Sequence, residues 1–161
     1  MKFEVEAIGV VRGARDKAED DYWGGARSCI ELVDGFDESA LDGIEAFSHV
    51  EILFLFDRVE PESVVSGARH PRNNQAWPAI GIFAQRGKKR PNRIGSTICQ
   101  VIGREGNRLD VAEFDAIEGS PVLDIKPVMQ EFLPRTEVHQ PDWSRELMRA
   151  YWLPERNSAK R

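Results

Sequence analysis

Short β-prone runs separated by turn residues constrain the fold of this 161-residue chain more than any other feature. Short strands dominate, and no strand–helix unit repeats along the chain. The runs that we expect to form strands are residues 3–8, 28–33, 50–56, 79–84, 94–102, 109–114 and 122–125. Among them, 50–56 is almost continuously apolar and too short for most helices, which favours a central, buried strand. The sequence therefore predicts a mainly β fold, a single small β-barrel with short helical insertions.

Helix signals are confined to two segments. Asp37 stands where it can cap a short helix that Gly43 limits. Residues 141–153 have helical spacing of their apolar side chains and lie between two prolines. We expect residues 1–140 to form the barrel, and residues 141–161 to form the C-terminal helix and tail of the same domain.

The sequence argues against several classes of protein. The longest apolar run, residues 52–56, is far shorter than the roughly 18 residues that a membrane span needs. The N-terminus mixes acidic residues among apolar ones, unlike a signal peptide, so we expect a cytoplasmic protein without a membrane segment. Cys29 and Cys99 are far apart and form no CxxC, which excludes a disulfide framework and a Cys-rich zinc site. The three histidines are scattered, so the sequence predicts no metal site.

Common cofactor and nucleophile motifs are also missing from the sequence. No GxGxxG follows a strand and opens a helix, so a Rossmann dinucleotide site is not supported. Residues 81–89 lack the glycine spacing and the Ser or Thr of a P-loop. No GxSxG marks a nucleophile elbow. Chemistry by a pair of carboxylates stays open, because the chain has 27 acidic residues, but no pair stands out.

Acidic and basic residues are unevenly distributed. The chain has a formal charge of −5, yet the 42 residues from Ser63 to Arg104 contain 8 Lys and Arg and no Asp or Glu. The flanks therefore hold 14 basic and 27 acidic residues, a charge of −13. Such a window is either the footprint of an anionic, phosphate-bearing partner or an exposed loop neutralised by acidic neighbours in the fold. Charge alone does not decide between these two interpretations.

Three stretches could contact a ligand. Residues 81–95 predict a strand, a tight basic loop stiffened by a proline, and a second strand. Arg86 and Arg90 on a stiff loop would grip an anion with little loss of entropy, although a solvent-exposed hairpin turn has the same pattern. Residues 114–127 place acids around a Gly-Ser-Pro turn, where they could face a cationic ligand or simply cap turns. The aromatic pair within residues 20–25 could stack on a flat ligand or anchor its loop.

Five motifs resemble those of the TsaA-like, or TrmO, family. In chain order they are AIGV at 7–10, GIEAFSHV at 43–50, GIFAxR at 81–86, RPNxIG at 90–95 and GSPVLDIKP at 119–127. Together they extend over most of the chain. RPNxIG and GSPVLDIKP in this order are the most specific of the five.

The resemblance implies a small β-barrel that binds S-adenosylmethionine without a Rossmann fold, as a homodimer with the cofactor near the subunit interface. Characterised members methylate threonylcarbamoyl-adenosine in the anticodon loop of tRNA at N6. The resemblance therefore implies an S-adenosylmethionine-dependent tRNA methyltransferase. By position, it assigns cofactor binding to Tyr22, Trp23, Gly24, Asp57, Arg58, Arg86, Ser96, Phe114, Asp115, Ala116 and Ile117.

For such a reaction we expect positioning and exclusion of water to matter more than a covalent nucleophile. The candidates for accepting the proton that the substrate nitrogen loses are Asp115 and Asp124, and Asp115 could also hold the cationic sulfur. The residues expected to bind phosphate groups or the threonyl carboxylate are Lys88, Lys89, Arg90, Asn92 and Arg93. Two alternatives stay open: methylation of a small molecule with the same cofactor, and a non-catalytic module that binds S-adenosylmethionine or RNA.

Overall fold

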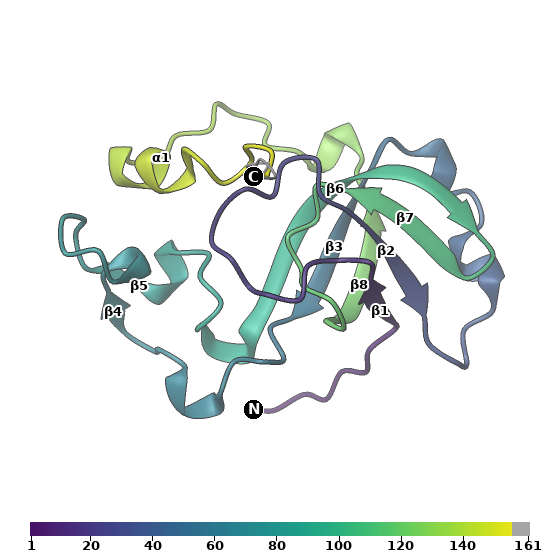
Figure 1. Ribbon diagram of the computed structural model, residues 1–161, viewed down its shortest axis with the longest axis horizontal. Coiled ribbons are helices and arrows are strands. Elements are labelled where there is room, and N and C mark those ends of the chain that lie inside the picture. The colour runs from purple at the N-terminus through teal and green to yellow at the C-terminus, as the bar shows by residue number, and fades with distance from the viewer. Residues whose placement is uncertain (156–161) are drawn as a thin grey trace, which may run out of the picture.

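Six antiparallel strands close into a barrel in the computed structural model, which describes residues 1–155 (Figure 1). Around the barrel the order is β1-β2-β7-β6-β3-β8. The strands are β1 (Gly9–Arg12), β2 (Arg27–Leu32), β3 (His49–Leu55), β6 (Ile94–Glu105), β7 (Arg108–Ala112) and β8 (Pro121–Pro127). The prediction of a mainly β fold built on one small barrel is confirmed.

Alternating side chains fill the barrel. In β3, Val50, Ile52 and Phe54 are buried, whereas Leu53 and Leu55 on the opposite face are only half-buried. This strand is central, since it pairs with both β6 and β8, but it is not buried on both faces as its continuous apolar run predicted. The reason is the architecture: each strand of a small barrel has one face inside and one face outside.

The first predicted strand is displaced along the chain. Residues 3–8 have no regular strand, and Phe3 and Val5 are exposed, because their alternation has no core to face. Strand β1 begins instead at Gly9, where the backbone lies against β2: a Cβ on this glycine would come within 2.9 Å of the Glu31 carbonyl oxygen. The close approach requires glycine at this position.

The long connection from β3 to β6 leaves the barrel as a separate lobe, which we call the lobe (residues 56–93). It contains a two-stranded sheet of β4 (Ala68–Arg69) and β5 (Ile80–Gly81). The strand predicted at 79–84 is therefore only two residues long, and a 3₁₀ turn follows it. The 3₁₀ turns of the whole structure are Glu38–Leu41, Ile44–Ala46, Pro61–Ser63, Pro71–Asn73, Ile82–Ala84, Pro91–Arg93 and Gln130–Phe132. Asp37 caps the first of these turns, as predicted: its side chain accepts a hydrogen bond from the Ser39 amide at 2.8 Å.

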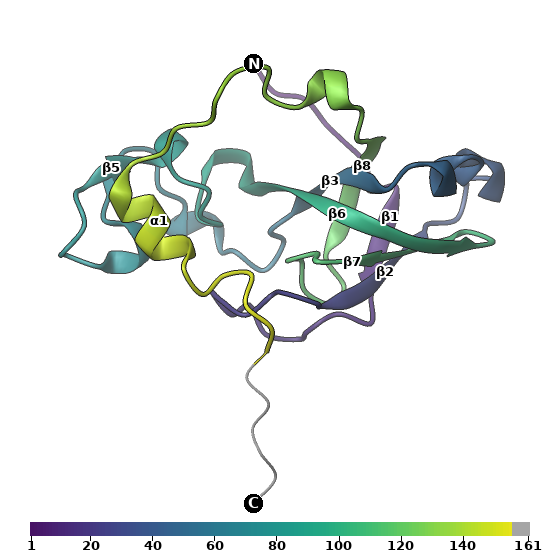
Figure 2. The ribbon, with the colours of Figure 1, turned by 90° about the horizontal axis from the view of Figure 1, so that it is seen from above.

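The C-terminal helix α1 (Asp142–Met148) lies beside the lobe in both views (Figures 1 and 2). It is shorter than the predicted 141–153, because turns replace the helix after Met148. The Trp77 indole of the lobe donates a hydrogen bond of 2.8 Å to Glu146 on this helix. Within residues 1–155, no helix combines the length and the apolar character that crossing a membrane demands.

The segment after α1 is attached to the loop between β1 and β2, over residues 22–24. The amides of Tyr22, Trp23 and Gly24 donate to the carbonyls of residues 150, 151 and 153 at 3.1, 2.7 and 3.1 Å. A Cβ on Gly24 would lie 2.0 Å from the Trp152 carbonyl oxygen, so only glycine allows this contact.

Phe54 stacks its ring over the backbone of the neighbouring strand. It packs edge-to-face against Phe56 and Phe114, with ring centroids 5.1 and 5.2 Å apart. Its partner in β6 is Gly95, where a Cβ would lie 2.5 Å from the ring. The glycine therefore leaves the space that the aromatic cluster fills.

We predict that Gly95→Ala destabilises the protein by about 1–3 kcal/mol, because a rigid ring in a packed core cannot move aside without cost. Gly103→Ala is the matched control: it lies in the same strand, and a Cβ there meets nothing within 4 Å. Urea denaturation measures both variants. Equal stabilities of the two variants would contradict the packing argument.

Candidate functional site

One large cleft lies among the mouth of the barrel, the lobe and the C-terminal segment. Its volume is about 1610 Å³, well above that of a single small ligand. The barrel contributes the start of β6 and the loop 113–120, the lobe contributes residues around 80–90, and the third wall is α1 with the turns that follow it. We call this space the main cleft.

Asp115 is the best-connected carboxylate of the main cleft. Thr97, a buried residue of β6, donates its hydroxyl to one carboxylate oxygen. Tyr151, from the turns after α1, donates its phenol to the other. Two hydroxyl donors from distant parts of the chain therefore fix the orientation of this carboxylate.

The surroundings of Asp115 keep a neighbouring phenol and a neighbouring thiol protonated. Burial, the negative charge of Asp115 and the hydrogen bond to it raise the pKa of the Tyr151 phenol well above its usual range, so the phenol stays a donor. Burial and the charges of Asp115 and Glu113 likewise raise the pKa of the Cys99 thiol. Cys99 is therefore a neutral thiol and no candidate nucleophile.

Arginines of the basic loop brace the lobe through main-chain carbonyls. Arg86 donates to the Ser96 carbonyl, Arg90 to Gln85 at 2.8 Å and Arg93 to Val59 at 2.8 Å. These bonds hold the loop against β6 and the start of the lobe, which agrees with the stiff loop that the sequence predicted.

The structure separates the basic window into two groups, apart from Arg69, which donates to the Asn73 side chain at 2.8 Å. Arg72 forms a two-pronged bond to the Asp21 carboxylate, at 2.8 and 3.0 Å, and Arg104 pairs with Asp42 at 2.8 Å. Within residues 1–155, no carboxylate lies within 4 Å of the cations Arg86, Lys88, Lys89, Arg90 and Arg93. Neutralisation by acidic neighbours thus describes Arg72 and Arg104, whereas it does not describe the basic loop.

Most of the residues predicted for the site share the main cleft. They are Trp23, Asp57, Arg58, Arg86, Lys88, Lys89, Arg90, Ser96, Asp115, Ala116 and Ile117. Arg58 also joins two loops, because its guanidinium donates to the carbonyls of Asp16 and Glu118 at 2.8 and 2.6 Å. The Ser96 hydroxyl is committed to Glu51, at 2.6 Å.

Other predicted residues do not line the main cleft: Tyr22, Gly24, Asn92, Arg93, Phe114 and Asp124. Phe114 is a core residue, and the Gly24 amide donates a hydrogen bond to the carbonyl of residue 153 in the C-terminal segment. Asp124 lies on β8, where its carboxylate accepts from the Ile125 amide at 2.9 Å and from Lys126. The structure thus separates the two predicted proton acceptors and leaves only Asp115 in the main cleft.

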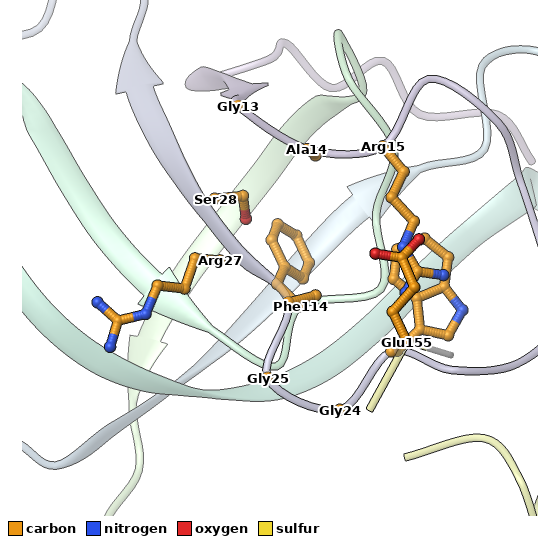
Figure 3. A pocket seen from close by; sticks show the side chains of 11 residues that line it. Gly13, Ala14, Arg15, Gly24, Gly25, Arg27, Ser28, Phe114 and Glu155 are labelled. Atoms are coloured by element: carbon orange, nitrogen blue, oxygen red, sulfur yellow. The ribbon is translucent and has the colours of Figure 1, made fainter. Parts of the chain in front are cut away.

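Trp23 separates the main cleft from a smaller pocket of about 380 Å³. Figure 3 shows Phe114 inside this pocket, with Arg27 and Ser28 on one side and Arg15 and Glu155 on the other. The indole is almost fully buried, donates to the Glu19 carbonyl at 3.1 Å and lies 4.4 Å below the Arg15 guanidinium. The contacts of Trp23 are those of a loop anchor.

Sequence reasoning missed three side chains of the main cleft. Thr97 and Tyr151 carry no motif, and only the fold brings them to Asp115. Phe83 belongs to the GIFAxR motif, but the strand predicted at 79–84 did not indicate that its side chain is exposed on a 3₁₀ turn.

We predict that Tyr151→Phe lowers the free energy of unfolding by about 2 kcal/mol at pH 8, because it leaves a carboxylate oxygen without its donor. The phenol has a raised pKa in the folded state, so its contribution is complete below the unfolded value of about 10 and is lost as the pH rises above it. The difference between wild type and variant should therefore narrow from pH 8 to pH 11 in urea denaturation. A constant difference would contradict the buried hydrogen bond.

Comparison with known proteins identifies relatives of this chain. A "Putative S-adenosylmethionine-dependent methyltransferase RcsF" of Pseudomonas aeruginosa is 41% identical over 105 residues, which are 63% of this chain and 44% of that protein. The human tRNA (adenine(37)-N6)-methyltransferase is 36% identical over 119 residues, 72% of this chain and 26% of that protein. The chain thus spans less than half the length of either relative.

A crystal structure of TrmO from Pseudomonas aeruginosa has the same fold. It superimposes with a TM-score of 0.71 at 29% identity, covering 89% of this chain and 62% of that one. The family model of the tRNA-methyltransferase O N-terminal domain matches residues 19–132, from the aromatic loop to the 3₁₀ turn that follows β8. The family predicted from the five motifs is confirmed: the chain belongs to the family of tRNA-methyltransferase O N-terminal domains.

Proposed function

We propose that this protein transfers a methyl group from S-adenosylmethionine to N6 of threonylcarbamoyl-adenosine in the anticodon loop of a tRNA. The observation that carries the proposal is the division of charge in the main cleft. Asp115 lies in its interior, and the basic loop, without carboxylate partners among residues 1–155, lies on the lobe. The names of the RcsF and human relatives, which specify S-adenosylmethionine and tRNA adenine 37, support the donor and the acceptor.

The residues of the main cleft fit a sulfonium donor. S-adenosylmethionine, when bound, supplies an electrophilic methyl group on a positively charged sulfur. A carboxylate favours such a charge in a partly enclosed cleft, and Asp115 on the barrel side and Asp57 at the start of the lobe could hold it. Arg58 and Arg86 could hold a carboxylate of the donor or the acceptor.

Asp115 is the proposed catalytic residue. Its two oxygens each accept one hydroxyl, so further lone pairs remain to accept the proton that leaves the substrate nitrogen. Tyr151 and Thr97 are positioning residues, since they hold this carboxylate in one orientation. Trp23 and the neighbouring C-terminal segment shield the interior of the main cleft from water.

We predict that Asp115→Asn lowers the rate of methyl transfer about 100-fold, because the neutral amide neither accepts the proton nor balances a cationic sulfur. Asp124→Asn is the matched control outside the main cleft and should keep a rate close to that of wild type. Mass spectrometry of the nucleosides of modified tRNA measures both. A strong loss with Asp124→Asn alone would move the catalytic acid to β8.

Lys88 and Lys89 are the proposed phosphate contacts. Both are exposed, line the main cleft and stand on the braced loop. Ammonium groups that neutralise phosphates release bound counterions, so their contribution depends on salt.

We predict that Lys88→Ala with Lys89→Ala weakens tRNA binding and reduces the slope of log Kd against log salt by about 1.5, because two phosphate contacts are lost. The double variant Lys2→Ala with Lys126→Ala removes the same charge outside the main cleft and should keep the slope. Fluorescence anisotropy at several salt concentrations measures both. An unchanged slope in the first variant would remove these lysines from the interface.

We further propose a cytoplasmic homodimer in which residues 1–140 and the C-terminal helix and tail act as one domain. The outer face of β6 supports dimer formation, because Ile94, Ile98 and Ile102 are 37%, 47% and 40% exposed along one strand. The backbone bonds from residues 22–24 to residues 150–153 support the single domain. Residues 156–161 of that tail lie outside the described part of the chain.

A further inference from the structure

An exposed phenylalanine stands in the main cleft beside the basic loop. Phe83 is 76% exposed, whereas the other two phenylalanines that line this space, Phe54 and Phe56, belong to the packed aromatic cluster. Single exposed apolar side chains are common on protein surfaces, and what distinguishes Phe83 is its position in a cleft next to cations.

Phe83 is rigidly mounted. Its neighbour Ile82 is buried and donates its amide to the Gly67 carbonyl at 3.0 Å. Gln85, two residues on, donates to the carbonyls of Arg69 and Ile80 at 3.0 and 2.6 Å. The ring therefore projects from a fixed 3₁₀ turn, and ordering it on a ligand costs little entropy.

The same turn leads into the unpaired cations. Lys88 and Lys89 follow Phe83 within six positions, and no carboxylate within residues 1–155 pairs with them. A fixed aromatic ring next to free cations is the combination that binds single-stranded nucleic acid, because the ring stacks on a base while the cations bind the backbone. Bases inside an RNA duplex are already stacked on each other and do not offer a face to such a ring.

We infer that Phe83 stacks on an unpaired base of the RNA, next to the nucleotide that reacts. The inference rests on the proposed function, since it identifies how that substrate is recognised in the main cleft. It makes Phe83 a specificity residue that selects looped over paired RNA, independently of the phosphate contacts.

The test compares Phe83→Leu and Phe83→Trp with wild type, using a fluorescent RNA hairpin with an unpaired loop and an RNA duplex of the same composition. Leucine keeps apolar volume without a π-face, so the hairpin Kd should rise about tenfold. Tryptophan stacks and should bind within about twofold of wild type. Duplex binding should be the same in all three proteins.

Phe132→Leu is the matched control, because Phe132 is 86% exposed on the 3₁₀ turn Gln130–Phe132 and does not line the main cleft. Its hairpin affinity should equal that of wild type. Two further measurements are calorimetry with S-adenosylmethionine and sedimentation of each variant. The affinity for S-adenosylmethionine and the oligomeric state should both be unchanged in Phe83→Leu.

The outcomes separate the two proposals. If Phe83→Leu binds the hairpin as tightly as wild type, the stacking role is overturned and Phe83 is a surface residue without a role in binding. If the loss of hairpin affinity accompanies dissociation of a dimer, the stacking role is also overturned and Phe83 is a subunit contact. A wild-type protein that binds the hairpin through Phe83 but shows no heat with S-adenosylmethionine would leave the stacking in place and overturn the proposed methyl transfer.

Discussion

Pairing of β8 with both β1 and β3 closes the barrel, and the position of the main cleft follows from this closure. A closed sheet has no free edge, so the long connections must leave through its mouths. The β3–β6 connection becomes the lobe, and the β7–β8 connection carries Asp115 to the same mouth. The main cleft is therefore formed by loops whose ends are fixed by strands, which is how many folds combine a rigid scaffold with a variable site.

The main cleft holds a carboxylate and several cations that do not form ion pairs with each other within residues 1–155. The arginines of the basic loop donate to main-chain carbonyls, and none of the loop's cations pairs with a carboxylate among residues 1–155. Asp115 accepts neutral hydroxyls, which likewise fix it without neutralising it. Under the proposed function, such an arrangement suits a ligand that is cationic at one end and anionic at the other.

The sequence predicted the fold class and the family well, because short strands and ordered motifs are local signals. The strand predictions failed where tertiary contacts decided the outcome. Phe3 and Val5 alternate like strand residues but are exposed, and the predicted strand at 79–84 gives way to a 3₁₀ turn within the lobe. The sequence did not distinguish Asp115 from Asp124 as a proton acceptor, since both stand near the Gly-Ser-Pro turn. Only the three-dimensional fold shows which of them reaches the main cleft. Tyr151 was beyond sequence reasoning, because its partner lies 36 positions away.

The attachment of residues 150–153 to residues 22–24 has a consequence for biosynthesis. All six barrel strands leave the ribosome before the segment that carries Tyr151, since β8 ends at Pro127. The nascent chain can therefore complete its sheet while the carboxylate at the mouth still lacks one of its two hydroxyl donors. The Tyr151 hydroxyl therefore reaches Asp115 only after every strand of the barrel has been synthesised.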